Sequence, residues 1–222
     1  MEKTAIIVAG GTGTRMNAGI PKQFLLLGGK PMLMHSIIAF IEAYPEISII
    51  LALPSDQFTA WKQLCEQHSF TIIHQVVAGG ETRFQSVQNA LKLIGDDGLV
   101  AIHDGARPMI SVSLIRTTFI TAVQLGNCIP VIPLNESVRQ ISGETNRSAD
   151  RHAFRIVQTP QVFRSDVIKK AYSREFLESF TDDASVAESA GETIHLAEGD
   201  PLNIKITHPY DLAVAEMLLN SR

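Results

Sequence analysis

The residues best suited to chemistry at the start of the chain are a set of glycines and two cations. An apolar run at residues 4–8 is followed by the sequence AGGTGTRM at residues 9–16. Glycine lets backbone N–H groups approach an anion closely. Arg15 and Lys22 add two positive charges to the same stretch. Glycines, bare amides and cations together predict a polyphosphate site.

The spacing of these glycines differs from both common phosphate loops. A Walker loop ends in Gly-Lys-Ser/Thr, whereas Gly13 is followed by Thr14 and Arg15. A dinucleotide fingerprint needs a third glycine where Met16 stands, which argues against a nicotinamide enzyme. On the glycines alone, an ordinary strand-to-helix turn remains an equal alternative.

Composition limits the partners that the chain can have. Its 222 residues carry a net charge of −4, which argues against nucleic acid as the main partner. A polyphosphate site must therefore be a local cationic pocket. We expect a single domain over residues 1–222.

Other features point to a cytoplasmic protein that has no membrane partner. We recognise no signal-peptide pattern and no apolar run long enough to span a bilayer. Cys65 and Cys128 are isolated in the sequence, so neither structural zinc nor a disulfide framework is expected.

Strand-like and helix-like segments alternate along the chain, which predicts an α/β fold with a mostly parallel sheet and helices on both faces. The expected strands are residues 4–8, 47–53, 70–77, 99–102 and 128–132. The expected helices are residues 31–43, 55–67, 81–94 and 111–125. The glycine-rich loop, the Gly79-Gly80 turn and His103-Asp104 then fall at the carboxyl edge of the sheet, where such folds bind ligands.

The alternation stops between about residues 134 and 156. Two short strands at 138–141 and 152–156 would enclose a polar tip at 142–150. This pattern predicts a protruding β-arm, although a plain surface loop fits about as well.

Three further segments have simple structural interpretations. Asp182 and Asp183 fit the first turn of a helix starting at Thr181 better than a second metal site. Residues 203–207 alternate like an edge strand, on which Lys205 would face solvent. Residues 210–219 predict a helix packed in the core.

Eight ordered blocks run through the chain: AGGTGTRM (9–16), PKQ (21–23), GGETRFQSV (79–87), HDGARP (103–108), DR (150–151), QTPQVF (158–163), TDDAS (181–185) and NIKIT (203–207). Together they resemble the 2-C-methyl-D-erythritol 4-phosphate cytidylyltransferase family, from the first strand to about residue 216. The resemblance implies a Rossmann-like fold and a homodimer that exchanges its arms. It also implies Mg²⁺-assisted transfer of CMP from CTP to a polyol phosphate, with release of pyrophosphate.

The resemblance also implies roles for individual residues. The catalytic cations would be Arg15, Lys22 and Lys205. The nucleotide would contact Ala9, Gly10, Gly11, Gly13, Gly80, Glu81, Ser86 and Gly105. The polyol phosphate would contact Asp104, Arg107, Ser137, Arg151 and Thr159, partly from the partner's arm. Asp104 would also lie near Mg²⁺, which phosphate oxygens would mostly hold.

This transfer needs no protein nucleophile, because the substrate phosphate attacks the α-phosphorus itself. We expect Arg15 and Lys22 to stabilise the departing pyrophosphate and Lys205 to stabilise the α-phosphoryl oxygens. Gly10, Gly105 and Ser137 depart from the usual family pattern, but none of these changes removes a charged group.

Two other functions remain open on sequence grounds. A cytidylyltransferase for ribitol 5-phosphate or another polyol phosphate would share most of the blocks. A non-catalytic dimer that binds CTP would need the glycines but not all three cations.

Overall fold

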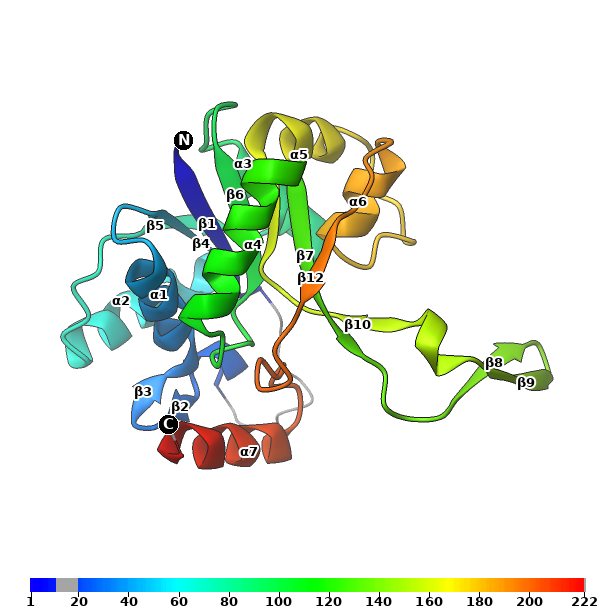
Figure 1. Ribbon diagram of the computed structural model, residues 1–222. Helices are drawn as coiled ribbons and strands as arrows, with labels where there is room; N and C mark the ends of the chain where they lie inside the picture. The colour runs from blue at the N-terminus through cyan, green and yellow to red at the C-terminus, as the bar shows by residue number, and fades with distance from the viewer. Residues whose placement is uncertain (11–19, 222) are drawn as a thin grey trace.

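The fold is seen in a computed structural model of the protein, which describes residues 1–10 and 20–221 (Figure 1). Gly11, Gly13 and Arg15 of the predicted phosphate loop lie outside the described residues. The α/β fold expected from the alternating segments is confirmed.

The main sheet has the strand order β10-β7-β11-β6-β1-β4-β5, and β12 pairs with β7. Strands β6, β1, β4 and β5 are parallel to one another, whereas β11 and β10 are antiparallel to their neighbours. The strands are β1 (Lys3–Val8), β4 (Ser48–Leu53), β5 (Gln75–Ala78), β6 (Leu99–Asp104), β7 (Asn127–Pro133), β10 (Arg155–Val157), β11 (Gln161–Arg164) and β12 (Leu196–Glu198).

Helices cover both faces of this sheet, as the sequence predicts (Figure 1). One apolar layer joins the sheet to α1 (Met32–Ala43), α2 (Phe58–Gln67) and α4 (Val112–Leu125). The other joins it to α3 (Arg83–Leu91), α5 (Ser165–Tyr172) and α6 (Asp183–Ser189). In β1, Ile7 faces the first layer and Ile6 the second, as the two-residue period of a strand requires. Because helices cover both faces, the middle of each parallel strand is mostly apolar, and polar side chains that can meet a ligand lie where the strands end.

The segment before β5 is the first difference from the sequence-based expectation. A strand is expected over residues 70–77, but β5 begins at Gln75. Trp61 Nε1 donates to His74 Nε2 at 2.8 Å, and His74 Nδ1 lies 2.7 Å from the Ile72 carbonyl. These contacts hold the residues before β5 against α2 in an irregular conformation.

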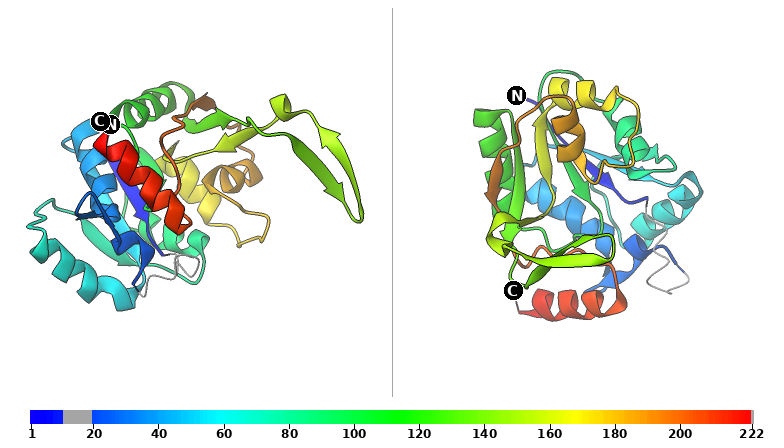
Figure 2. Two further views of the ribbon diagram at one scale, coloured as in Figure 1. Left: turned by 90° about the horizontal axis from the view of Figure 1, so that it is seen from below. Right: turned by 90° about the vertical axis from the view of Figure 1, so that its right-hand side faces the viewer.

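The arm is a second difference. Strand β8 (Val138–Ser142) pairs with β9 (Thr145–Ala149), which lies inside the segment expected to be the tip. The expected second strand at 152–156 is wrong, because Arg151–Ala153 is a 3₁₀ turn and Arg155–Val157 pairs with β7. Figure 2 (left) shows the β8–β9 hairpin extending well away from the sheet.

The C-terminal helix α7 (Pro209–Asn220) packs only one side against the molecule (red in Figure 2). Ala215 is buried beside Leu27 and Ile206, but Tyr210 and Met217 are largely exposed. The expected packing of this helix in the core therefore holds for the face that carries Ala215, but not for Tyr210 and Met217.

Two shorter features complete the described chain. Strands β2 (Leu26–Leu27) and β3 (Lys30–Pro31) form a small hairpin before α1. Short 3₁₀ turns cover Lys22–Phe24 and Ser55–Gln57. Within the described residues, no helix is long and apolar enough to cross a membrane, and Cys65 and Cys128 are both free thiols.

Candidate active site

The strand order changes direction at β1, which opens a crevice at the carboxyl edge of the sheet. Strand β1 lies between β4 and β6, and Val8 pairs with Asp104 at the ends of β1 and β6. Ligands of open α/β sheets bind at such a switch point. The Val8–Asp104 pairing agrees with the prediction that the start of the glycine-rich loop and His103-Asp104 meet at this edge.

Two adjoining cavities occupy this edge. The first has a volume of about 360 Å³ and is lined by Val8, Ala9, Gly10, Lys22, Gln23, Gly80, Glu81, Thr82, Arg83, Ser86, Asp104, Ala106 and Lys205. The second has a volume of about 250 Å³ and is lined by Arg83, Asp104, Arg107, Val157, Gln158, Thr159, Gln161, Thr181, Asp182 and Lys205. Arg83, Asp104 and Lys205 line both cavities, so they form the wall between them.

A larger cavity of about 590 Å³ lies elsewhere, around the amino end of β4. Its lining includes seven isoleucines, two glutamates and His74 among the described residues, but neither Lys nor Arg. A triphosphate needs cations, so this larger cavity does not fit it.

The first cavity gathers most of the residues that the sequence assigns to a nucleotide. The Ala9 carbonyl accepts a 2.7 Å bond from Gln23 Nε2, which fixes the start of the glycine-rich loop. The Gly80 amide donates to Ser86 Oγ at 3.1 Å. Lys22 Nζ lies 3.3 Å from the Ile206 carbonyl at the edge of this cavity. These contacts shape the cavity floor.

Gly105 lies behind this floor rather than in it. A methyl group added at Gly105 would meet Leu33 Cδ1 at 2.9 Å and Ala9 Cβ at 3.2 Å. Gly105 is also absent from the described lining of both cavities. The structure thus brings it beside Ala9, but places it on the side of the apolar core.

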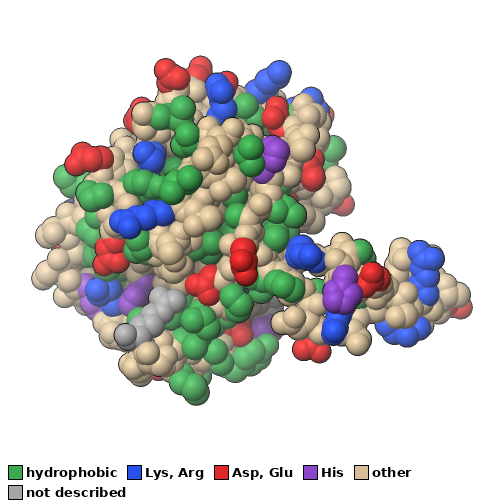
Figure 3. Space-filling model, viewed as in Figure 1, with side chains coloured by type: hydrophobic (Ala, Val, Ile, Leu, Met, Phe, Trp, Pro, Cys, Tyr) green, Lys and Arg blue, Asp and Glu red, His purple; other side chains and the backbone are tan. Residues whose placement is uncertain are grey.

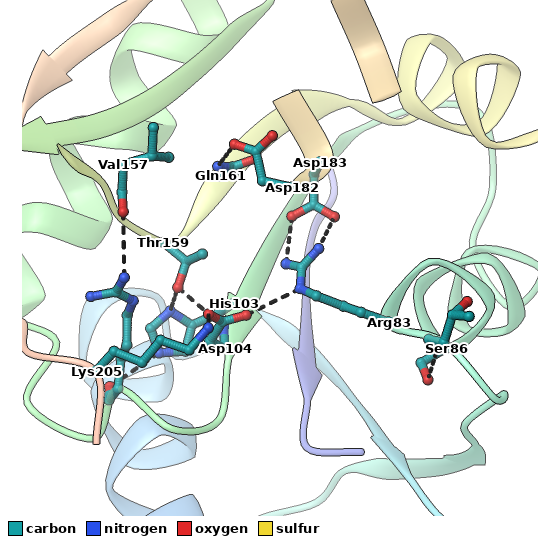
Figure 4. A network of polar contacts seen from close by, with 12 residues as sticks. Arg83, Ser86, His103, Asp104, Val157, Thr159, Gln161, Asp182, Asp183 and Lys205 are labelled. Atoms are coloured by element: carbon teal, nitrogen blue, oxygen red, sulfur yellow. Dashed lines mark hydrogen bonds and ion pairs between the residues drawn. The ribbon is translucent and has the colours of Figure 1, made fainter. Parts of the chain in front are cut away.

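The wall between the cavities is built from three charged side chains (Figure 4). Asp104 Oδ2 lies 2.7 Å from Lys205 Nζ, and Asp104 Oδ1 lies 3.2 Å from Arg83 Nε. Arg83 also makes two bonds to Asp183, Nη1 to Oδ1 at 2.8 Å and Nη2 to Oδ2 at 2.7 Å. Tyr172 donates its hydroxyl to Asp183 Oδ1 at 2.6 Å.

This network keeps both partners of the Arg83–Asp104 pair charged. Burial alone would raise the pKa of the Asp104 carboxyl, but Arg83 and Lys205 outweigh it and hold that pKa well below its usual range. Burial alone would lower the pKa of Arg83, but Asp183 and Asp104 outweigh it and raise that pKa. Arg83 and Asp104 therefore stay charged across the physiological pH range.

Asp104 is also fixed through its backbone. Its amide donates to Thr159 Oγ1 at 3.1 Å, so the Thr159 hydroxyl is free to donate to His103 Nδ1 at 3.0 Å. His103 Nε2 then donates to the Arg107 carbonyl at 3.2 Å. Burial lowers the pKa of His103 to about 4, so the ring is neutral and serves as structural support. The sequence assigns it no chemistry.

Lys205 is held by a loop and not by the edge strand expected at 203–207. No strand forms there in the structure. Asn203 Nδ2 donates to the Thr159 carbonyl at 2.8 Å, and the Ile206 amide donates to the Ala106 carbonyl at 2.8 Å. Asn203 and Ile206 are buried and Lys205 between them is exposed, so burial does not follow the two-residue period of a strand, and the hydrogen bonds run to other loops.

Arg107 is expected from the sequence to grip a substrate phosphate. Its side chain lines the second cavity but is mostly buried. It donates from Nη1 to the Asn203 carbonyl at 2.7 Å and from Nη2 to the Val157 carbonyl at 3.4 Å. In the structure, Arg107 thus ties the Lys205 loop to the end of β10.

The structure does not bring Ser137 and Arg151 to these cavities within one chain. Both lie on the arm, where Arg151 Nη1 donates to the Asn135 carbonyl at 2.6 Å. Figure 3 shows blue and purple side chains of Arg and His spread along this arm, which stands clear of the body. Within one chain, neither Ser137 nor Arg151 is among the described residues that line the two cavities.

Sequence reasoning gives Arg83 and Gln23 no role in the site, and it interprets Asp183 only as part of the first turn of a helix. Arg83 opens α3 directly after the Thr82 cap, and Asp183 opens α6 directly after the Asp182 cap. The Asp182 cap agrees with the expected helix start, one residue later than Thr181. A cation just after the Gly79-Gly80 turn is the available signal for Arg83. Its partner, 100 residues away, cannot be identified from spacing.

The residues present fit Mg²⁺ only through a bound substrate. Within the described residues, no group of three or more His, Cys, Asp or Glu side chains could hold a metal. Asp104 offers one carboxylate, and both of its oxygens already accept bonds from cations. A single carboxylate beside phosphate oxygens is a common Mg²⁺ arrangement.

The fold and the cation-lined double cavity define a class of protein, an α/β enzyme that brings a nucleotide and a second anionic substrate together. Within that class, the chain belongs to the 2-C-methyl-D-erythritol 4-phosphate cytidylyltransferase family, whose model matches residues 3–221.

Individual relatives agree over their full lengths. The chain is 48% identical to the 2-C-methyl-D-erythritol 4-phosphate cytidylyltransferase of Bacteroides thetaiotaomicron, covering 99% of this chain and 100% of that protein. It is 49% identical to the enzyme of the same name from Bacteroides fragilis, with the same coverage. The crystal structure of the Thermus thermophilus enzyme is similar with a TM-score of 0.79 and 32% identity, covering 99% of this chain and 100% of that one.

Proposed function

We propose that the Arg83–Asp104–Lys205 wall lies between CTP in the first cavity and the polyol phosphate in the second. The chain is a cytidylyltransferase, and it transfers CMP from CTP to 2-C-methyl-D-erythritol 4-phosphate. The observation that carries the proposed arrangement is that Asp104 and Lys205 line both cavities at once.

The chemistry follows from this placement. A phosphate oxygen of the polyol attacks the α-phosphorus of CTP and forms a new P–O bond. The bond from the α-phosphorus to the bridging oxygen breaks, and pyrophosphate leaves with the electron pair. No proton needs to be removed from an ionised phosphate. The protein therefore works by positioning and by charge stabilisation.

Each cation has a place in this reaction. Lys205 Nζ, now 2.7 Å from Asp104, would turn toward the oxygens on the α-phosphorus as charge develops there. Lys22 at the edge of the first cavity, together with Arg15, would stabilise the departing pyrophosphate. The Asp104 carboxylate would accept bonds from polyol hydroxyls. The glycines and Ser86 would hold the nucleotide.

Mg²⁺ would be held mainly by the triphosphate, with Asp104 as its nearest protein carboxylate. When bound, it would neutralise phosphate charge and so favour departure of pyrophosphate.

The arm supplies what one chain lacks. We propose that the chain is a homodimer in which the arm of one copy, at about residues 134–156, reaches the second cavity of the other. Arg151 would then pair with the polyol phosphate through its guanidinium fork, and Ser137 would donate a hydroxyl. Arg107 would position the Lys205 loop and hold its remaining donors toward the same phosphate. Both substrates are small and anionic, and we place the reaction in the cytoplasm.

A pyrophosphate-release assay tests the function. The purified protein is given CTP with 2-C-methyl-D-erythritol 4-phosphate, with ribitol 5-phosphate, or with no acceptor, and ATP, GTP and UTP replace CTP in parallel. We expect release with CTP and the methylerythritol phosphate well above every other combination. Equal release with ribitol 5-phosphate would favour a broader polyol-phosphate enzyme. CTP binding without release in any arm would favour the non-catalytic alternative.

A further inference from the structure

Arg83 occupies a position in the wall that neither substrate explains. It is the first residue of α3, yet its guanidinium reaches both the end of β6 at Asp104 and the start of α6 at Asp183 (Figure 4). Its side chain is 30% exposed, whereas that of Asp183 is fully buried. Arg83 therefore joins a buried anchor to a wall that faces the cavities.

All three guanidinium nitrogens of Arg83 already donate to carboxylates. Nη1 and Nη2 bond to the two oxygens of Asp183, and Nε bonds to Asp104 Oδ1. A guanidinium presents its donors in one rigid plane, so the position of Nε is fixed once the Asp183 fork is made. Asp183 is fixed in turn by the Tyr172 hydroxyl at 2.6 Å.

Lys205 is held less firmly than Arg83. Its side chain is 47% exposed, and Asp104 Oδ2 is the partner recorded for its ammonium. If Lys205 moves to a phosphate, Asp104 loses one of two cations, and its side chain is only 13% exposed in the structure. A carboxylate with so little access to water needs a remaining partner. Arg83 Nε is placed to be that partner.

We propose that Arg83 is a positioning residue that holds Asp104 in place while Lys205 moves between Asp104 and the reacting phosphate. Anchored by Asp183, it keeps the wall intact in both positions of Lys205. This inference rests on the role proposed above for Lys205.

Direct contact with the nucleotide would be the competing role for Arg83. Such a contact would use the charge of the guanidinium, which Asp183 already balances. It would also act independently of Lys205, whereas a positioning role acts through Lys205. The two roles therefore differ in how substitutions combine.

A double-mutant cycle separates them. Arg83→Lys keeps the charge but cannot make the Asp183 fork and the Asp104 bond together. We expect it to lower kcat about 100-fold, because a small misplacement of a reacting group costs about that much. We expect the KM for CTP to change by less than about 3-fold. In a Lys205→Met background, the same substitution should cost less than about 3-fold, since its effect passes through Lys205.

The outcomes distinguish the two proposals. If the kcat losses of Arg83→Lys and Lys205→Met multiply in the double variant, the positioning role of Arg83 would be overturned, whereas the role of Lys205 would stand. A Lys205→Met variant with normal kcat would overturn both. If Arg83→Lys does not fold, as judged by circular dichroism, Asp183→Asn replaces it in the same cycle, because it breaks the fork and leaves Arg83 in place. Arg164→Ala, which removes the exposed Arg164–Asp166 pair, is the control and should leave all constants unchanged.

Discussion

Asp104 Oδ2 lies 2.7 Å from Lys205 Nζ, although 101 residues separate them in sequence. The end of β6 supplies the carboxylate, and a loop tied to Thr159, Ala106 and Arg107 supplies the ammonium. The pair lines both cavities. A cation that two substrates can share is the feature on which the proposed chemistry depends.

Lys22→Ala should lower kcat more than it changes binding. Its ammonium lines the nucleotide cavity, where charge builds on departing pyrophosphate. Loss of one well-placed donor costs about 2.7–4 kcal/mol in the transition state, or about 10²–10³ in kcat. Pyrophosphate release measures the effect, with exposed Lys92→Ala as the matched control. Near-normal turnover in Lys22→Ala would remove this residue from the mechanism.

Two glycines of the nucleotide cavity should respond differently to a methyl group. At Gly80 the added carbon would lie 2.3 Å from Gln85 Cβ, and Gln85 Oε1 accepts bonds from the Glu81 and Thr82 amides. At Gly10 the nearest atom of the described residues, Ser86 Oγ, would be 3.6 Å away. We expect Gly80→Ala to cost about 1–3 kcal/mol of stability and to raise the KM for CTP.

Gly10→Ala serves as the comparison and should stay within about 0.5 kcal/mol of the parent protein. Urea unfolding and CTP titrations measure both variants. Equal effects at the two positions would mean that the packing around Gly80 is not what restricts it.

His103 should make stability depend on pH. Its pKa falls from 6.5 to about 4 on folding because the ring is buried. Between those pH values the unfolded chain binds a proton that the folded chain does not. The contribution of neutral His103 to the free energy of unfolding is therefore fully present above about pH 6.5 and declines as the pH falls toward 4. The shift corresponds to about 3 kcal/mol.

Urea unfolding at pH 7 and at pH 4 tests this dependence. His103→Gln removes the titrating group, so its stability should decline less over the same range. The low pKa of Asp104 adds a loss only as the pH falls below about 4. Identical declines in both proteins would contradict a buried neutral His103.

Much of the fold could be predicted from the sequence because its strands are buried on both faces. The runs that form β1, β4, β6 and β7 are short, continuous and mostly apolar, which is the pattern of strands buried on both faces of a sheet. The position of Asp104 follows directly, since the end of a parallel strand defines the binding edge. Segments held by side chains are predicted less well. Residues 70–74 are held by the bond from Trp61 to His74, and residues 203–207 by bonds to the distant carbonyls of Thr159 and Ala106.

The site shows the same division. Local pattern places the ends of β1 and β6 and the Gly79-Gly80 turn correctly. It does not identify Arg83, because the role of Arg83 depends on its bonds to Asp183. In the sequence, Asp183 fits the start of a helix as well as it fits an ion-pair partner. A local sequence pattern identifies the start of a helix, but it does not show that Asp183 at such a start is the buried partner of Arg83.

The central claim is that the cavities of one chain are completed by the arm of the other chain. The most direct test is whether mixing two inactive variants restores activity. Lys205→Met removes the cation of the body, and Arg151→Ala removes the cation of the arm. Each homodimer should turn over poorly, and Arg151→Ala should raise the KM for the polyol phosphate more than that for CTP.

The two proteins are unfolded together, refolded together, and assayed for pyrophosphate release from CTP and 2-C-methyl-D-erythritol 4-phosphate. Random pairing makes half of the dimers mixed, and each mixed dimer has one intact site, so we expect about a quarter of parent activity. Activity no higher than that of the two variants assayed separately would contradict the account, because it would mean that Arg151 and Lys205 do not act across two chains.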